Sequence, residues 1–253
     1  MSKDRIAIID GLRTPMGKMG GKLANYQADD LGAYAVRELV TRHADLKDQL
    51  DEVIIGNVSQ PAHAANVARV IALKAGIDKK VPAFTVHRNC ASGMEAITNA
   101  ANKIYAGDGE VFLAAGVESM SNVPLLFRKE AQNFLEALAR ARSFSQKLKI
   151  ISKFRLKFLK PLIGLKLGLT DPVCGMIMGD TAEVLAKEFG LTRQMQDRFA
   201  MQSHNKAEKA TKNGIFTEEI APIVSNPATG EVMQDDEGIR NGQNMKDLGK
   251  LKP

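Results

Sequence analysis

Strand-like and helix-like segments alternate over the first 116 residues of this chain, and this alternation limits the choice of fold more than any other feature. Short runs rich in β-branched residues are separated by segments whose apolar residues recur at helical spacing. The expected strands cover residues 5–9, 53–58, 81–87 and 111–115, and the expected helices cover residues 30–43, 64–75 and 91–105. Because parallel strands need crossovers, which helices supply, we predict an α/β fold with a mostly parallel central sheet ending near residue 122.

Residues 123–253 have a different texture, and we expect them to form a helical and irregular loop domain. A basic and apolar excursion covers residues 128–172, and a helical part covers residues 173–253. Helices are expected over residues 180–189 and 193–213, the second one starting after Thr192. Beyond Ile223 the chain is rich in Asn, Gly, Pro and Asp, which predicts a loop-dominated tail unless another part of the protein covers it.

The net charge of +6 comes from one segment of the chain. Residues 137–170 contain nine basic residues and no acidic one, and the remainder has 26 basic against 29 acidic residues. Five apolar residues of this segment are expected to share one face: Phe144, Leu148, Ile151, Phe158 and Leu162. Such an amphipathic unit suits an anionic membrane surface or a partner helix. The alternative is a solvated excursion whose apolar residues cover the protein's own surface.

Composition also bears on location and partners. Two cysteines, Cys90 and Cys174, are too few for a disulfide framework and fit a reducing compartment. We find no secretory signal or transit peptide and no apolar run long enough to span a bilayer, so we expect a cytoplasmic protein. Aromatic residues are not interleaved with the basic ones as a base-stacking platform, so we expect no nucleic acid partner.

The chemistry concentrates in residues 88–93, Arg-Asn-Cys-Ala-Ser-Gly, between an expected strand and an expected helix. A sharp turn there lifts Cys90 above the end of the sheet and points it at the helix amino terminus, as in a nucleophile elbow. The helix dipole and free backbone N–H groups favour a thiolate and can bind an oxyanion. The alternative is that Cys90 is a small buried hydrophobic residue, because local cysteine signatures alone do not establish catalysis.

Several groups of residues together resemble the amino-terminal part of thiolases. They occur in the family's order at residues 11–15, 89–93, 115–121, 178–183, 193–204 and 250–253. The stretch 138–161 looks most like the thiolase β-subunit of fatty-acid β-oxidation trifunctional complexes. The resemblance therefore implies a thiolase-like layered fold and an acyl-CoA C-acyltransferase.

The resemblance also implies a reaction and a set of site residues. Cys90 matches the cysteine that attacks a 3-ketoacyl-CoA and becomes acylated before coenzyme A accepts the acyl group, so coenzyme A is a co-substrate and no bound cofactor or metal is expected. Met178 matches a residue that lines the pantetheine pocket, with Leu169 on the same wall, and Arg240 matches an arginine that borders the adenine. Ile177, where biosynthetic members carry His, suggests longer acyl chains.

The sequence also departs from the family pattern. Thiolases use a histidine in a Gly-His-Pro motif and a second cysteine in a Cys-x-Gly motif, and residues 1–253 contain neither. We assign no catalytic role to the four histidines, His43, His63, His87 and His204, and we assign Cys174 a structural role. We therefore expect that the carboxy-terminal catalytic domain is absent and that this chain is inactive alone.

The expected partners are acyl-CoA substrates, a second copy of the chain, the α-subunit of a β-oxidation complex, and a membrane surface contacted through residues 140–163. Two rival functions remain: a Claisen-condensing (biosynthetic) thiolase or synthase, and a non-catalytic acyl-CoA-binding or scaffold module. Residues 178–183 and 193–204 resemble degradative thiolases and argue against a synthase.

Overall fold

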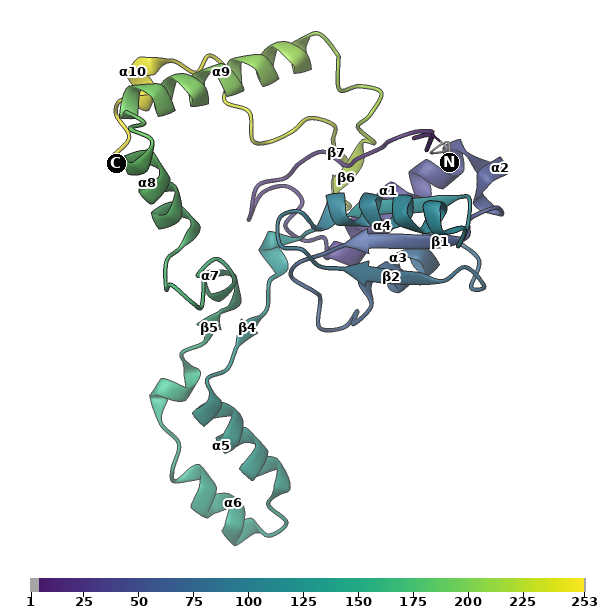
Figure 1. Cartoon of the computed structure of the whole chain (residues 1–253). Coiled ribbons are helices and arrows are strands. Elements are labelled where there is room, and N and C mark those ends of the chain that lie inside the picture. Colours follow the sequence, from purple (N-terminus) through teal and green to yellow (C-terminus); the bar gives the residue numbers. More distant parts are fainter. Residues whose placement is uncertain (1–4, 253) are drawn as a thin grey trace. The chain divides into compact units, whose positions relative to one another are not determined.

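The computed structural model describes residues 5–252, which group into two units (Figure 1). The sheet unit comprises residues up to Asn122 together with those from Thr192 onward, and the basic unit comprises Val123–Leu191. The expected division into an amino-terminal domain at residues 1–122 and a loop domain at residues 123–253 stays a prediction. Residues 1–4 of that domain and Pro253 of the last family landmark lie outside the described residues.

A parallel sheet of three strands forms the centre of the sheet unit as described. Strand β1 (Glu52–Gly56) lies between β2 (Ala83–Val86) and β3 (Phe112–Gly116). Its central residue, Ile54, is in register with Phe84 on one side and Ala114 on the other. The connecting helices are α1 (Ala28–Arg42), α3 (Val67–Lys74) and α4 (Ser92–Ala106). The predicted α/β fold with a parallel sheet is confirmed.

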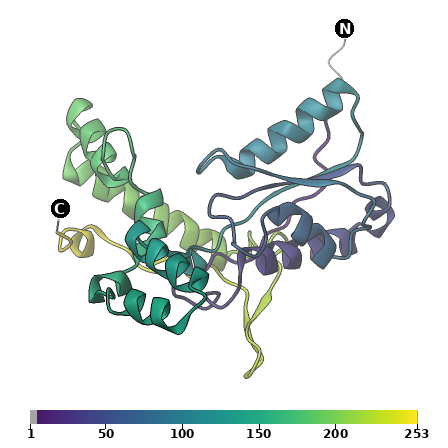
Figure 2. The same cartoon turned by 90° about the horizontal axis from the view of Figure 1, so that it is seen from below.

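Helices cover both faces of this sheet, and the alternation of side chains along β1 explains why. Val53 and Ile55 are fully buried against α1 and α3, whereas Ile54 is buried against α4. Figure 2 shows α4 on one side of the strands and the purple and blue helices α1 and α3 on the other. Strand β1 needs apolar side chains at consecutive positions because both of its faces are buried.

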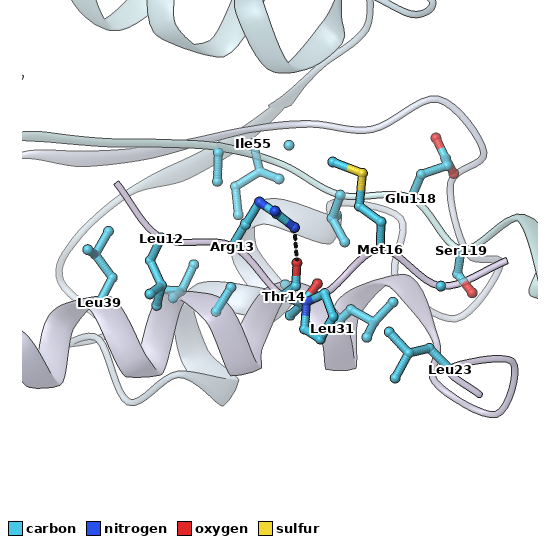
Figure 3. A pocket seen from close by; sticks show the side chains of 18 of the residues that line it. Leu12, Arg13, Thr14, Met16, Leu23, Leu31, Leu39, Ile55, Glu118 and Ser119 are labelled. Carbon is cyan, nitrogen blue, oxygen red and sulfur yellow. Dashed lines mark hydrogen bonds between the residues drawn. The ribbon is translucent and has the colours of Figure 1, made fainter. Parts of the chain in front are cut away.

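The predicted first strand at residues 5–9 is not formed. Residues 5–12 pair with no strand, and the side chains of Ile8 and Ile9 are 82% and 62% exposed. Two cavities of about 640 and 520 Å³ separate residues 6–19 from the outer edge of β3, and both are lined by Leu113 and Ala114. Figure 3 shows the larger one, with Leu12 and Leu39 among its lining residues. The segment is too far from β3 for ladder hydrogen bonds, so its β-branched residues do not make a strand.

The carboxy-terminal part of the sheet unit contains more structure than the predicted loops. Helix α9 (Arg193–Lys212) begins as predicted, with the Thr192 hydroxyl accepting from the Met195 N–H. A hairpin of β6 (Ile223–Asn226) and β7 (Glu231–Met233) follows, and α10 (Met245–Leu248) contacts α9. Ile223 and Met233 pack with Leu31 of α1, which stabilises this hairpin. The tail beyond Ile223 is dominated by loops as predicted, and the hairpin forms where a distant helix covers it.

The basic unit has little buried core of its own. It contains α5 (Lys129–Arg140), α6 (Phe144–Ile151), the short 3₁₀ helix η2 (Leu156–Leu159), α7 (Gly164–Gly168) and α8 (Met178–Glu188), and β4 (Leu125–Leu126) pairs with β5 (Leu162–Ile163). Two further short helices, α2 (Ala44–Lys47) and η1 (Met120–Asn122), belong to the sheet unit.

The predicted single apolar face over residues 144–162 is wrong in its geometry. Phe144, Leu148 and Ile151 lie on α6, but the helix ends there, and Phe158 lies on η2. Phe158 turns to the rings of Phe134 and Phe154, with centroids 5.4 and 6.0 Å away, because aromatic packing offers burial that α6 does not. Within residues 5–252, no helix is long and apolar enough to cross a membrane.

Candidate active site

The loop that carries Cys90 joins the end of β2 to the start of α4. Because the three strands are parallel, their carboxyl ends meet at one edge of the sheet, and α4 begins at that edge. Cys90 lies two residues before the first residue of α4, and it is exposed. The structure therefore places Cys90 at a strand-to-helix turn as predicted and rules out a buried position, whereas its catalytic role stays a prediction.

Hydrogen bonds hold this loop in a strained shape. Asn89 has a φ of 45°, in the left-handed region that few residues other than glycine adopt. The Ser92 hydroxyl donates to the Asn89 carbonyl at 2.7 Å and accepts from the Arg88 N–H at 2.9 Å. Ser92 is buried, so the loop is fixed from beneath while Cys90 faces outward.

Three glycines let the start of α4 pack directly on the edge of the sheet. A Cβ placed on Gly56, the last residue of β1, would lie 2.2 Å from the backbone of Ser92. A Cβ on Gly116, the last residue of β3, would lie 3.0 Å from the Cα of Gly93. The sequence predicts Gly56 inside a strand and Gly116 just after one, and the role of both follows only from this contact between backbones.

A carboxylate ties the ends of β1 and β3 together beside this loop. Glu118 accepts hydrogen bonds from the Val58 N–H at 2.9 Å and from the Ser59 N–H at 3.2 Å. The side-chain amide of buried Asn57 donates to the Val117 carbonyl at 2.9 Å. These residues shape the sheet edge on which Cys90 stands, and the sequence analysis did not identify them as part of the site.

The Cys90 backbone N–H is free to act on a ligand. Within residues 5–252 this N–H has no hydrogen-bond acceptor, whereas those of Ala91 and Ser92 donate to the Arg88 and Asn89 carbonyls at 3.0 Å. A free N–H at a helix start is suited to stabilising an oxyanion on the atom attached to the cysteine sulfur.

Each of the four histidines contacts a residue other than Cys90. His43 contacts Asp10 at 2.8 Å, and His63 contacts Asp29 at 3.0 Å. His87 Nδ1 accepts from the Asn89 N–H at 3.4 Å, and His204 Nδ1 accepts from the Arg240 N–H at 3.3 Å. No hydrogen bond joins any of the four to the Cys90 sulfur in the described part of the chain, and that none of them is its base stays a prediction.

The residues matched to coenzyme A binding lie in both units. In the basic unit, an isolated bridge between Thr170 and Ile177 brings the adjacent residues Leu169 and Met178 near each other, and both side chains are about half exposed. Arg240 lies in the sheet unit, exposed, on the segment that follows β7. These roles stay predictions.

Two other features do not contribute to a site around Cys90. Cys174 is exposed; its N–H donates to Asp171 at 2.9 Å in a turn, so it contributes backbone and not core packing. Neither of the two cavities beside β3 is lined by Cys90. Among residues 5–252 no group of three or more His, Cys, Asp or Glu residues could hold a metal ion.

An outward-facing cysteine on a strand-to-helix turn of a layered α/β sheet is an arrangement suited to acyl transfer through a thioester. The family model of the thiolase amino-terminal domain matches residues 6–253. This chain belongs to the thiolase family, whose members are acyltransferases.

Individual relatives agree with this membership. The chain is 35% identical to a 3-ketoacyl-CoA thiolase of Yersinia enterocolitica and 36% identical to one of Photorhabdus laumondii, in each case over 99% of this chain and 56% of the relative. Among solved structures, a Bacillus anthracis acetyl-CoA acetyltransferase has a TM-score of 0.82 at 32% identity, covering 96% of this chain and 57% of that one. Human mitochondrial 3-ketoacyl-CoA thiolase in complex with CoA has a TM-score of 0.79 at 31% identity, covering 96% of this chain and 56% of that one. The chain thus spans little more than half the length of these relatives.

Proposed function

We propose that this chain supplies the acyl-accepting cysteine of a thiolase that cleaves 3-ketoacyl-CoA in fatty-acid β-oxidation. The observation that carries the proposal is the exposed Cys90 at the start of α4, with its own N–H free. The thiolate attacks the 3-keto carbon, and the bond between C2 and C3 breaks. The C2 carbanion takes a proton and leaves as acetyl-CoA, and coenzyme A then takes the acyl group from Cys90.

The coenzyme A would contact three further residues in this proposal. Met178 and Leu169 present apolar side chains to its pantetheine arm, and Arg240 borders its adenine. Two relatives named 3-ketoacyl-CoA thiolase, and a solved thiolase in complex with CoA, support this choice of substrate. We infer a cytoplasmic location from the two free cysteines.

General acid and base groups have to come from outside residues 1–253 in this proposal. His43 and His63 each contact a carboxylate, at 2.8 and 3.0 Å, which supports this. Loss of general-base assistance costs about 100-fold to 10,000-fold in rate. A homodimer, and an association with the α-subunit of a β-oxidation complex, are the partners that we propose for the complete enzyme.

Mass spectrometry of an acyl adduct tests the proposal. The chain is co-expressed with a second polypeptide that corresponds to the remaining part of its relatives, incubated with acetoacetyl-CoA and quenched. We expect the adduct on Cys90, thiolysis only in the combined sample, and loss of both in Cys90→Ser. An adduct at another residue, or full thiolysis by this chain alone, would refute the proposal.

Alkylation separates the enzyme from a non-catalytic binding module. Cys90 and Cys174 are both exposed, so access does not distinguish them. A Cys90 thiolate stabilised by the start of α4 should react with iodoacetamide much faster than Cys174 at neutral pH. Equal slow labelling of both thiols would favour the scaffold function.

We also propose that the basic unit contacts an anionic membrane surface through residues 140–163. The side chains of Phe144 and Leu156 are 81% and 80% exposed, next to nine basic residues without an acidic one. Among the described residues only Arg140 of these nine forms an ion pair, with Glu136 at 3.2 Å. Apolar side chains beside unpaired cations suit insertion into a headgroup layer.

Co-sedimentation with lipid vesicles tests this second proposal. We expect binding to phosphatidylglycerol vesicles and not to phosphatidylcholine vesicles. Deleting residues 140–163 should abolish it while the sheet unit stays folded, and Phe144→Ser with Leu156→Ser should weaken it strongly. Val173→Ser is the matched control, because Val173 is 94% exposed in the same unit outside the segment. Unchanged sedimentation of the deletion variant would exclude the membrane contact.

A further inference from the structure

Two adjacent acidic residues, Asp236 and Glu237, lie just before Arg240 and bind the amino-terminal loop at residues 13–22. The Arg13 guanidinium donates two hydrogen bonds to the Asp236 carboxylate, of 2.8 Å from Nη1 and 3.0 Å from Nη2. Arg13 Nε also donates to Glu219 at 2.7 Å. Burial raises the pKa of Asp236, but the hydrogen bonds from Arg13 and the Met16 N–H outweigh it and hold that pKa below its usual value. Arg13 and Asp236 therefore form a bidentate ion pair.

Glu237 continues this contact through the loop backbone. Its carboxylate accepts from the Lys18 N–H at 2.8 Å and from the Lys22 N–H at 3.2 Å. Its own N–H donates to the Met16 carbonyl at 3.0 Å. Asp236 accepts from the Met16 N–H at 2.7 Å. Hydrogen bonds to a carboxylate are roughly twice as strong as neutral ones, so both acids fix the loop firmly.

Arg240 is held between this contact and helix α9. Its N–H donates to His204, and the Gly242 N–H donates to Glu208 of α9 at 2.8 Å. The Arg240 side chain itself is exposed. The backbone is therefore anchored on both sides of an arginine whose guanidinium is free to meet a ligand.

We propose that Arg13, Asp236 and Glu237 are positioning residues that set the affinity for coenzyme A by fixing the backbone that presents Arg240. This inference rests on the proposed function, which makes Arg240 a contact of the nucleotide. It assigns a role to Arg13, which belongs to the motif at residues 11–15 and takes no part in the proposed reaction. Arg13 acts through Asp236, which lies 223 positions away in the sequence.

Calorimetric titration of the full chain with coenzyme A tests the inference. Arg13→Gln and Asp236→Asn should each weaken binding about fivefold or more, in the range of typical coupling between sites. Arg13→Lys should recover little of the affinity for coenzyme A that Arg13→Gln loses, because an ammonium cannot make the bidentate contact with Asp236. Glu231→Gln is the matched control: it removes the exposed pair of 2.8 Å between Lys22 of the same loop and Glu231 of β7, and it should leave binding unchanged.

Hydrogen–deuterium exchange supplies a readout that does not depend on the ligand. In Arg13→Gln, exchange should rise in residues 235–242 while α3 and α4 keep their protection. Unchanged exchange in residues 235–242, or a general loss of protection, would overturn the inference. So would unchanged affinity in Arg13→Gln when Arg240→Gln is weakened. If Arg240→Gln itself binds normally, the assignment of Arg240 under the proposed function is what fails.

Discussion

At the scale of single residues, the position of Cys90 depends on three glycines, which carry no Cβ atom. Gly56, Gly116 and Gly93 line one close approach between the sheet edge and the start of α4, but they differ in the space available. A Cβ would lie 2.2 Å from the nearest atom at Gly56, 3.0 Å at Gly116 and 3.7 Å at Gly93. Only the last distance is an ordinary van der Waals contact.

We therefore predict a graded series for alanine substitutions at these three glycines. Gly56→Ala should destabilise the protein by about 3 kcal/mol, because the clash is with backbone and α4 must shift. Gly116→Ala should cost less, and Gly93→Ala should be nearly neutral. Urea denaturation followed by circular dichroism measures the series. Equal effects at Gly56 and Gly93 would show that the approach is looser than the structure indicates.

At the scale of elements, helices α1 and α3 are joined by a buried carboxylate. Asp29 of α1 has a side chain with no exposed surface, and it accepts from Lys74 of α3 at 2.6 Å and contacts His63 at 3.0 Å. Burial raises the pKa of Asp29, but the hydrogen bonds from Lys74 and His63 outweigh burial and hold that pKa below its usual value. Folding therefore favours the ionised form of Asp29.

The lowered pKa of Asp29 predicts how the stability of the protein changes with pH. The stabilisation by Asp29 is fully present above the unfolded value of about 3.9 and is lost as pH falls through the lower folded pKa. Asp29→Asn should cost about 2 kcal/mol at neutral pH and should flatten the loss of stability below about pH 4. Denaturation midpoints from pH 2.5 to 7 measure both effects.

Asp30→Asn is the control for this prediction. Asp30 contacts the same Lys74 Nζ at 2.7 Å, but its side chain is 43% exposed. Its substitution should change stability by no more than about 0.5 kcal/mol, as for other surface ion pairs. If the two variants were equally destabilised, burial would not be the reason for the effect of Asp29.

At the scale of the whole molecule, the two units differ in how much core they have. The sheet unit buries a continuous cluster from α1, α3 and β1, whereas Ala131 is the one buried apolar residue among the described residues of the basic unit. Regions with few buried contacts open locally at low free energy. The basic unit should therefore open well before the sheet unit unfolds.

Limited trypsin digestion measures this difference. The first cuts should fall after basic residues between Arg140 and Lys166. Arg69 serves as the internal comparison, because its guanidinium donates to the Val81 and Lys79 carbonyls at 2.7 Å and it lies on α3. Early cleavage after Arg69 would contradict the prediction. Phosphatidylglycerol vesicles should slow the cuts in residues 140–166 if the membrane proposal holds.

Most elements of the sheet unit were predictable from local sequence. Gly76, with a φ of 80°, ends α3 where the sequence predicts it, and Thr192 caps α9. The structure differs from local expectation where pairing or burial comes from far along the chain. Residues 5–9 have the composition of a strand but no partner, and β6 packs on α1 from about 190 residues away, a separation that local patterns do not report.

The sequence by itself determined the α/β architecture and the position of Cys90 at a turn between a strand and a helix. Both follow from short-range periodicity and from the turn residues around position 90. The tertiary structure alone decided which glycines bring α4 onto the sheet edge. It alone also decided that Arg13 pairs with Asp236. Those contacts join residues distant in sequence, and their energies depend on distances of a few ångströms that only the packed chain defines.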